Sequence, residues 1–233
     1  MQLANAVVLI TGANRGIGQA FAREALARGA RRVYAAARDP GSVKLPGVLP
    51  IQLDVTDPGQ VARAARECRD VTLLINNAGV AETGGFLQDD ALASARRQLD
   101  VNFFGMLQMA QAFAPVLAAN GGGALLNVLS IASWINRPLL GTYGATKSAA
   151  WALTNGLRHE LRAQGTQVTA LHMGFVDTDL TRGIDMPKAA PGDIARAAFD
   201  GLEAGADEVL ADERTRQVKE SLSSAAAAYL SAE

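Results

Sequence analysis

A tyrosine and a lysine four positions apart are the residues of this sequence best suited to proton transfer. Tyr143 and Lys147 lie in a segment with helical periodicity, and at 3.6 residues per turn their side chains project from one face, roughly 40° apart. A free phenol has a pKa of about 10, and a neighbouring ammonium favours the phenolate and lowers that pKa. We therefore expect Tyr143 to donate and accept the proton and Lys147 to lower its pKa. Taken alone, the pair also fits a tyrosine and a surface lysine on any helix.

The chain begins with the pattern of a strand, a glycine-rich turn and a helix. Residues 6–10 are apolar and rich in β-branched side chains, and residues 19–28 have helical periodicity. Between them, Gly12 allows a tight turn, Gly16 lets backbone N–H groups approach a pyrophosphate, and Gly18 lets the helix pack closely on the strand. The spacing G-x-x-x-G-x-G differs from the general dinucleotide fingerprint G-x-G-x-x-G, and alone it also fits a structural loop.

Further motifs follow in order along the chain. They are Asp54-Val55, Asn76-Asn77-Ala78-Gly79, Asn102, Ser130 and Gly174-Phe175-Val176-Asp177-Thr178. With the glycine turn and the tyrosine–lysine pair, the sequence resembles the short-chain dehydrogenase/reductases, in their short single-domain branch, over about residues 6–210. The resemblance implies a nicotinamide-dependent oxidoreductase on a Rossmann-type sheet. One position departs from the family pattern, because Met173 stands where the family usually has proline.

The resemblance implies four catalytic residues: Asn102, Ser130, Tyr143 and Lys147. Ser130 and Tyr143 would donate hydrogen bonds to the substrate oxygen, and Tyr143 would supply the proton. Lys147 would also bond the nicotinamide ribose, and Asn102 would support a water that connects the lysine to solvent. Ser133 is the alternative serine, but its offset from the tyrosine differs by three residues, so we expect it to line the pocket.

The preference between the two nicotinamide cofactors depends on the end of the second predicted strand. An acidic residue there bonds the ribose of NAD, whereas an arginine accommodates the 2′-phosphate of NADP. This chain has Ala37 at the family's acid position, followed by Arg38, and Arg15 lies in the glycine turn. We therefore expect NADP, with NADPH preferred over NADH. Two alternatives stay open: both arginines are solvated, or Asp39 reaches the ribose.

The resemblance also assigns the remaining cofactor contacts. Asp54 is expected at the adenine edge, although an aspartate at a strand end is often only a turn or helix cap. Asn77 follows the fourth strand at the ligand-binding edge, where an ordinary turn is the alternative. The full expected set is Gly12, Asn14, Arg15, Gly16, Ile17, Gly18, Arg38, Asp54, Val55, Asn77, Ala78, Gly79, Tyr143, Lys147, Gly174, Val176 and Thr178.

Alternating strand and helix patterns predict an α/β fold, a Rossmann-type doubly wound parallel sheet with helices on both faces. Expected strands are residues 6–10, 32–37, 49–53, 71–75, 124–129, 167–172 and 208–210. Expected helices are residues 19–28, 61–69, 99–118, 142–163 and 191–202, with the alanine-rich 221–232 a helix or frayed tail. At 233 residues and 49% hydrophobic content we expect a single domain, 1–233, of which 212–233 is a C-terminal helix or tail.

Composition excludes several classes of function. The 22 basic and 23 acidic residues give a formal net charge of −1, so neither nucleic acid nor a membrane surface is an expected partner. Cys68, the single cysteine, cannot form an intrachain disulfide, the first strand leaves no room for a signal peptide, and no apolar run reaches the ~20 residues of a spanning helix. We expect a cytoplasmic protein. Two histidines and one cysteine lie far apart, so no metal is expected.

The expected partners are a small carbonyl or alcohol substrate and further copies of the chain. By resemblance, the two long helices pair into a homodimer or homotetramer, for which Met109, Phe113 and Trp151 are available. A largely apolar pocket favours a medium-sized hydrophobic ketone or aldehyde, with residues 179–190 as a lid. Its expected lining is Val80, Phe86, Trp134, Leu139, Leu140, Met173 and Phe175. Arg137, Arg182 and Lys188 flank it and leave an acidic substrate as the alternative.

Two other functions stay open. The first is a non-catalytic NADP-binding regulator on the same fold, since a fold does not determine a function. The complete Asn102, Ser130, Tyr143 and Lys147 set argues against it, because a sensor does not need it. The second, an epimerase or dehydratase of the family's larger branch, is disfavoured by the short chain and the glycine spacing.

Overall fold

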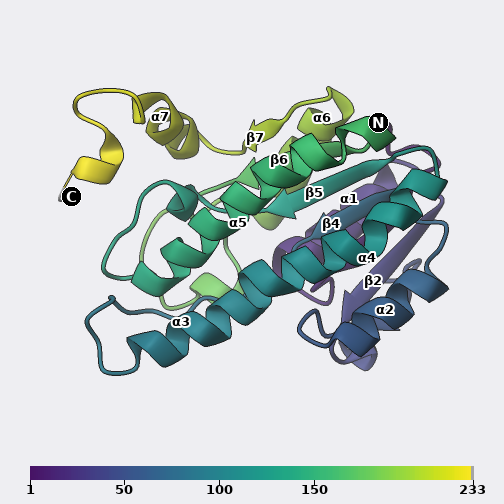
Figure 1. The fold of residues 1–233 in the computed structure, drawn as a ribbon, viewed down its shortest axis with the longest axis horizontal. Coiled ribbons are helices and arrows are strands. Elements are labelled where there is room, and N and C mark those ends of the chain that lie inside the picture. Colours follow the sequence, from purple (N-terminus) through teal and green to yellow (C-terminus); the bar gives the residue numbers. More distant parts are fainter. Residues whose placement is uncertain (232–233) are drawn as a thin grey trace.

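A seven-stranded sheet in which every pairing is parallel forms the centre of the molecule (Figure 1). The structure is a computed structural model that describes residues 1–231. The strand order is β3-β2-β1-β4-β5-β6-β7. The strands are β1 (Val7–Thr11), β2 (Arg32–Ala37), β3 (Leu49–Gln52), β4 (Leu73–Asn76), β5 (Ala124–Val128), β6 (Gln167–His172) and β7 (Glu208–Leu210). The predicted doubly wound α/β fold is confirmed.

Helices cover both faces of the sheet. They are α1 (Gly16–Ala27), α2 (Pro58–Glu67), α3 (Ala91–Leu99), α4 (Met106–Ala119), α5 (Gly141–Glu160), α6 (Pro191–Glu203) and α7 (Glu213–Ser221). Helices α1 and α6 pack together on one face, whereas α2, α4 and α5 cover the other, which faces the viewer in Figure 1. A π-helical segment, Asp100–Gly105, joins α3 to α4.

Strand β1 shows why the strands are apolar almost throughout. Its alternate side chains enter two different cores: Val8 and Ile10 lie in the core under α1 and α6, and Val7 and Leu9 lie in the core under α2 and α4. A parallel sheet with both faces covered requires such a run, because neither face is open to water. Burial of each large aliphatic side chain contributes roughly 1.5–3 kcal/mol.

The crossovers change direction between β1 and β4, which lie side by side although they are not consecutive in sequence. Strands β2 and β3 continue from β1 toward one edge, and β5, β6 and β7 continue from β4 toward the other. In open α/β sheets this switch point opens a crevice at the carboxyl ends of the strands, where ligands bind. The turns after β1 and β4 therefore lie where a cofactor would enter.

Two helical predictions differ from the structure. The helix expected at 99–118 begins at Ala91 and passes through the π segment, so the chain is helical to Ala119. The C-terminal helix is α7, which ends at Ser221, where the alanine-rich segment was expected to begin. Turns and a 3₁₀ turn, Ala228–Leu230, follow it, and Ala232 lies outside the described residues. Alanine has high helix propensity, but a short helix with no face to bury is only marginally stable.

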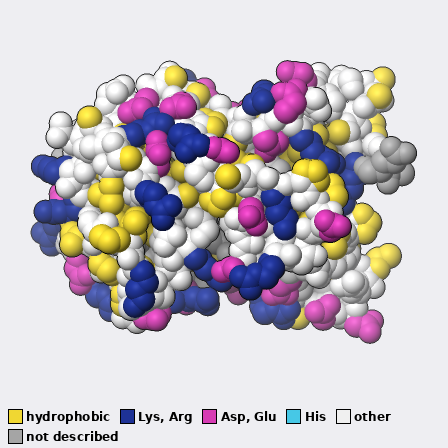
Figure 2. All heavy atoms as spheres, turned by 180° about the vertical axis from the view of Figure 1, so that it is seen from behind, with side chains coloured by type: hydrophobic (Ala, Val, Ile, Leu, Met, Phe, Trp, Pro, Cys, Tyr) yellow, Lys and Arg dark blue, Asp and Glu magenta, His cyan; other side chains and the backbone are white. Residues whose placement is uncertain are grey.

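Within the described residues one helix, Ala91–Ala119, is long and apolar enough to cross a membrane by length and composition alone. In this fold one face of the helix packs on the sheet, where Met109 and Phe113 are fully buried, and 39% of its apolar window is buried. The expectation that these two residues are available for subunit contacts is therefore wrong. Figure 2 shows the face opposite to that of Figure 1, where basic and acidic side chains are interspersed. The cytoplasmic location stays a prediction.

Candidate active site

The glycine turn after β1 is tied directly to the end of β4. Gly12 and Gly16 have φ of 65° and 54°, a left-handed conformation that favours glycine. The Thr11 hydroxyl accepts hydrogen bonds from the amides of Asn77 (3.0 Å) and Ala78 (2.9 Å). In return, Nδ2 of Asn77 donates to the carbonyl oxygens of Thr11 (2.8 Å) and Gly12 (3.2 Å). The two turns at the switch point therefore form one rigid unit.

The N-terminus of α1 is shaped for an anion. A Cβ added at Gly18 would lie 2.6 Å from Nδ2 of Asn77 and closer still to the carbonyl oxygen of Gly12, so only glycine lets the helix approach the turn this closely. No side chain caps α1, and its first turn carries no acidic residue. The free N–H groups and the positive end of the helix dipole can therefore hold a pyrophosphate. Asn14 and Ile17 lie partly exposed on either side.

Asn102 lies fully buried in the π-helical segment. Its Oδ1 accepts from the amide of Val80 (2.9 Å), and its Nδ2 donates to the carbonyl oxygen of Val80 (2.9 Å) and to Oγ1 of Thr146 (2.9 Å). One side chain thus joins the loop after β4 to α5, one residue before Lys147. A π segment widens the helix at one turn, and such segments are frequent at functional sites.

Ser130 and Tyr143 meet at the carboxyl end of β5. The side chain of Ser130 hydrogen-bonds the Tyr143 hydroxyl, and its Oγ also accepts from the amide of Ala132 (3.1 Å). Ser133 is buried, and its hydroxyl has no hydrogen-bond partner within residues 1–231. The structure therefore pairs Ser130, and not Ser133, with the tyrosine.

Lys147 is buried beneath the tyrosine. Its Nζ donates to the carbonyl oxygen of Val128 (3.0 Å) and lies 5.7 Å from the centre of the Tyr143 ring. Burial lowers the pKa of Lys147 to about 8, because the charged ammonium loses water. A Cβ added at Gly79 would lie 3.7 Å from Nζ and 3.2 Å from Oδ1 of Asn102, so this glycine leaves the space above both groups open.

The expected lowering of the tyrosine pKa is wrong for this structure. Burial raises the pKa of Tyr143 to about 12, and the hydrogen bond from Ser130 only partly offsets that rise. The ammonium of Lys147 is directed to the Val128 carbonyl and lies over the ring, away from bonding distance of the phenol oxygen. Loss of water around the phenol therefore outweighs the attraction between phenolate and ammonium.

At the adenine edge, β2 ends at Ala37 and Arg38 follows with its side chain exposed. Arg15 is also exposed, and its Nη1 lies 3.0 Å from the carboxylate of Asp179. Asp39 has one carboxylate oxygen occupied, since Oδ1 accepts from the amide of Gly41 (2.9 Å) at the N-cap of a 3₁₀ turn. The strand therefore ends where the sequence predicted, with an arginine first beyond it.

Asp54 forms a turn. Its Oδ1 accepts from the amide (3.0 Å) and the hydroxyl (2.7 Å) of Thr56, which matches the structural alternative for this residue. The next residue, Val55, is buried against the long helix: a Cβ added at Gly105 would lie 2.7 Å from its Cγ2. At the adenine side, one carboxylate oxygen of Asp54 is therefore engaged within its own turn.

The segment after β6 closes the other side of the crevice. A Cβ added at Gly16 would lie 3.2 Å from Cγ2 of Thr178, which places Thr178 over the glycine turn. Val176 is buried, and the amide of Gly174 donates to Oδ2 of Asp212 (2.7 Å). A cavity of about 590 Å³, lined by Gly16, Thr178 and residues of α1 and α6, lies beside this segment, on the cofactor side rather than at Tyr143.

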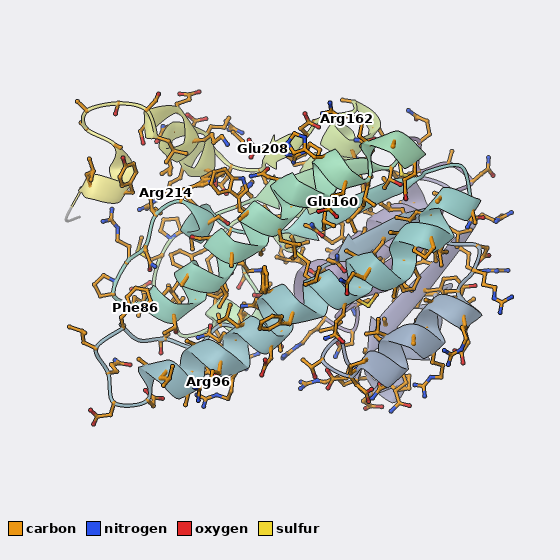
Figure 3. The ribbon with its side chains drawn as sticks, viewed as in Figure 1. Phe86, Arg96, Glu160, Arg162, Glu208 and Arg214 are labelled. Carbon is orange, nitrogen blue, oxygen red and sulfur yellow. The ribbon has the colours of Figure 1, made fainter. Side chains whose placement is uncertain are left out.

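Two residues expected in the substrate pocket lie elsewhere. Met173 is buried in the core under α1 and α6, and Trp134 stacks on His172 with ring centres 4.0 Å apart. By contrast, Phe86 (56% exposed) and Leu139 (50% exposed) lie near the first turn of α5, where Figure 3 labels Phe86. A Cβ at Gly141 would lie 3.4 Å from the Phe86 ring, two residues before Tyr143. The apolar mouth therefore comes from these loops.

Sequence reasoning missed two residues that organise the site. Gln98 is fully buried one turn before Asn102; its Oε1 accepts from the amide of Glu82 (3.1 Å), and its Nε2 donates to Oγ1 of Thr142 (2.8 Å). Asp212 caps α7 by accepting from the amide of Thr215 (2.8 Å) as well as from Gly174. For Gln98, the available sequence signal was a glutamine one helical turn before Asn102. The role of Asp212 depends on its tertiary contact with Gly174.

Comparison with known proteins identifies the family. The sequence model of the short chain dehydrogenase family matches residues 6–188, and the chain belongs to that family. A short chain dehydrogenase from Burkholderia cenocepacia J2315, solved in complex with NADP, is 38% identical and superposes with a TM-score of 0.93 over 97% of this chain and 95% of that one.

Two relatives of known sequence show how broad the family is. Galactitol 2-dehydrogenase (L-tagatose-forming) from Cereibacter sphaeroides is 35% identical over 77% of this chain and 75% of that protein. Dehydrogenase/reductase SDR family member 7B from Bos taurus is 33% identical over 76% of this chain. The match covers 60% of the bovine protein, so this chain corresponds to only part of it.

Proposed function

We propose that the protein is an NADP(H)-dependent oxidoreductase that transfers hydride between the nicotinamide and a carbonyl or secondary alcohol, chiefly reducing medium-sized hydrophobic ketones or aldehydes. The observation that carries the proposal is the meeting of Ser130, Tyr143 and Lys147 beside the glycine turn, at the carboxyl edge of the sheet. The acid Tyr143, the hydrogen-bond donor Ser130 and the cation Lys147 thus lie together at the edge of the sheet where a cofactor would bind.

The roles of the residues follow from their geometry. When bound, the nicotinamide supplies the hydride. Tyr143 is protonated at neutral pH, because its pKa is raised to about 12, and its hydroxyl would donate that proton as charge develops on the substrate oxygen. Ser130 supplies a second hydrogen bond to that oxygen, and Lys147 adds a positive charge beneath the ring.

Preference for NADPH rests on the adenine edge. Arg38 is the first side chain beyond β2 and is exposed, while the acid position of the family holds the buried, uncharged Ala37. A 2′-phosphate would meet Arg38, and no carboxylate on the last strand residue would repel it. The Burkholderia relative bound to NADP supports the same preference.

The hydrophobic substrate rests on which groups are free at the mouth. Phe86 and Leu139 are half-exposed and present apolar surface. Arg137, one of the cations that could bind a carboxylate, instead donates to the main-chain oxygens of Ala228 and Ser231, and Arg182 is paired with Asp179. Two of the three flanking cations are therefore engaged, and burial of a substrate's hydrocarbon against the apolar side chains would contribute about 25 cal/mol per Å².

The test is loss of NADPH absorbance with matched carbonyl substrates. We expect a higher kcat/KM for a hydrophobic ketone than for its carboxylated analogue of similar size and for a ketose of the kind that the galactitol enzyme is named for. The reverse ranking would show that the substrate is not a hydrophobic ketone but an acidic carbonyl compound or a sugar. If NADPH binds but no carbonyl or alcohol is turned over, the protein is a cofactor-binding regulator rather than a reductase.

We also propose that the chain forms a homodimer or homotetramer through the helical face of α5 and the long helix Ala91–Ala119, whose α3 and π segments contact α5 (Figure 1). Phe104, in the π segment, is 47% exposed, and Leu92 on α3 is 64% exposed. These apolar side chains replace Met109 and Phe113 as the contact residues. Light scattering at micromolar concentration should give a multiple of 24.3 kDa, and a monomer mass would refute the proposal.

A further inference from the structure

A lysine of the C-terminal helix is enclosed by two tryptophans and a carboxylate. Nζ of Lys219 lies 4.8 Å from the ring centre of Trp134, 5.3 Å from that of Trp151 and 2.6 Å from Oε2 of Glu208. Oε1 of Glu208 accepts a hydrogen bond from Nε1 of Trp151 (3.1 Å). Figure 3 labels Glu208 on β7, between α5 and α7. A cation held over aromatic faces and paired with a carboxylate is a specific site and not a solvated surface charge.

This cluster continues to the backbone of Ser130 through His172. The imidazole is fully buried and stacks on Trp134 with the ring planes 24° apart. Its Nδ1 lies 3.2 Å from the carbonyl oxygen of Ser130, which can only accept, so Nδ1 carries the proton. Burial lowers the pKa of His172 to about 4, so the ring is neutral.

Lys219 has an electrostatic role as well as a packing role. Nε2 of His172 has no hydrogen-bond partner within residues 1–231 and lies 3.8 Å from Oε1 of Glu208. In the neutral ring this nitrogen presents a lone pair, which the carboxylate repels. The ammonium of Lys219 balances the Glu208 charge and lets His172 stay neutral and bonded to Ser130.

Trp134 acts on the same serine along the chain. Trp134 follows the 3₁₀ turn Ile131–Ser133, and its amide donates to the carbonyl oxygen of Ile131 (3.1 Å). At the start of the same turn, the amide of Ala132 donates to Oγ of Ser130 (3.1 Å). A displaced Trp134 would open the turn and release the serine hydroxyl from its position. The indole and the imidazole therefore hold the serine from two sides.

We propose that Lys219 is a positioning residue for Ser130: seated between the two tryptophans, it holds Trp134 and His172 against the serine backbone and so fixes the hydroxyl beside Tyr143. Through this one side chain the C-terminal helix supports the catalytic serine. The catalytic consequence rests on the proposed function, whereas the positioning itself does not.

Hydrogen exchange and fluorescence test the positioning without any substrate. In Lys219→Met, amides of the turn at 130–134 should exchange about 5- to 30-fold faster, the factor that loss of a partly buried cation–π site implies. The sequence has two tryptophans, both in this cluster, so intrinsic emission should shift as well. Lys219→Arg should restore both signals because it keeps the charge. Arg214→Met, which removes an exposed charge from the same helix, should change neither. Unchanged exchange at the turn in Lys219→Met would overturn the proposal.

Turnover tests the consequence. We expect Lys219→Met to lower kcat about tenfold and to leave the affinity for NADPH unchanged. The effect should be smaller than the roughly 10²- to 10³-fold loss that follows complete removal of a hydrogen-bond donor to the substrate oxygen. In a Ser130→Ala background the same change should have no further effect, because both act through one hydroxyl. An equal loss in both backgrounds would refute action through Ser130. Inactive wild-type protein would refute the proposed function, and the exchange result would still decide the positioning.

Discussion

Replacing Arg38 with alanine isolates the contact that we assign to the 2′-phosphate of NADPH. The side chain is exposed directly beyond β2, so its removal leaves no cavity and exposes no core. A charge-assisted contact contributes roughly 1.5–3 kcal/mol, and each 1.36 kcal/mol is tenfold in affinity. Because salt screens an exposed charge, we take the lower end and expect the Kd for NADPH to rise about tenfold, with that for NADH nearly unchanged.

Calorimetric titration with each cofactor, at low and at moderate salt, measures this difference. Arg31→Ala is the matched control, because Arg31 is exposed just before β2 begins, at the opposite edge of the sheet. Arg15 is a poorer choice, since its loss also breaks the ion pair with Asp179. Equal weakening for NADPH and NADH, or none for either, would refute the assignment of Arg38.

Three further predictions concern the lysine, the glycine turn and the buried asparagine. Reduction should slow as pH rises through about 8, because Lys147 is an ammonium below its lowered pKa and neutral above it; a pH–rate profile that stays flat would contradict its role. Gly18→Ala should destabilise the fold by roughly 1–3 kcal/mol through overpacking and abolish NADPH binding. If titration gave the wild-type affinity for NADPH, the turn would have room for the added methyl group and this prediction would be wrong. Asn102→Ala leaves the partly buried amide of Val80 without its acceptor, so urea unfolding should show a loss of roughly 1 kcal/mol, and an unchanged midpoint would refute this bracing.

The sheet could be predicted because each strand is a short apolar run bounded by turn residues. The bounds of β2, β6 and β7 agree with the expected strands, and in β2 and β6 burial on both faces leaves a continuous signal. Helix α3 was missed, and α7 was expected only as a helix or tail somewhere within 212–233, because each buries only two side chains, too few for an apolar stripe. Helix α7 is capped locally by Asp212, and Lys219 holds it against Trp134 and Trp151, which lie far away in the sequence.

The identities and spacing of the site residues were readable from sequence, but their electrostatics were not. The spacing of Ser130 and Tyr143 predicted that they meet, and the structure pairs them by a hydrogen bond. The direction of the Tyr143 pKa depends on how much water burial removes and on where the Lys147 ammonium points, neither of which a spacing encodes. Trp134 was assigned to the pocket because it follows Ser130, yet stacking on His172 turns it toward α7.

Transfer of label from NADPH deuterated at the hydride position tests the central claim most directly. With a hydrophobic ketone, the wild-type protein should place one deuterium on the carbinol carbon of the product alcohol, as detected by mass spectrometry. Tyr143→Phe should bind NADPH normally and form almost no labelled alcohol, because the ring packs as before but has no proton to donate. An unlabelled product, or a Tyr143→Phe variant that forms labelled alcohol at the wild-type rate, would contradict the account.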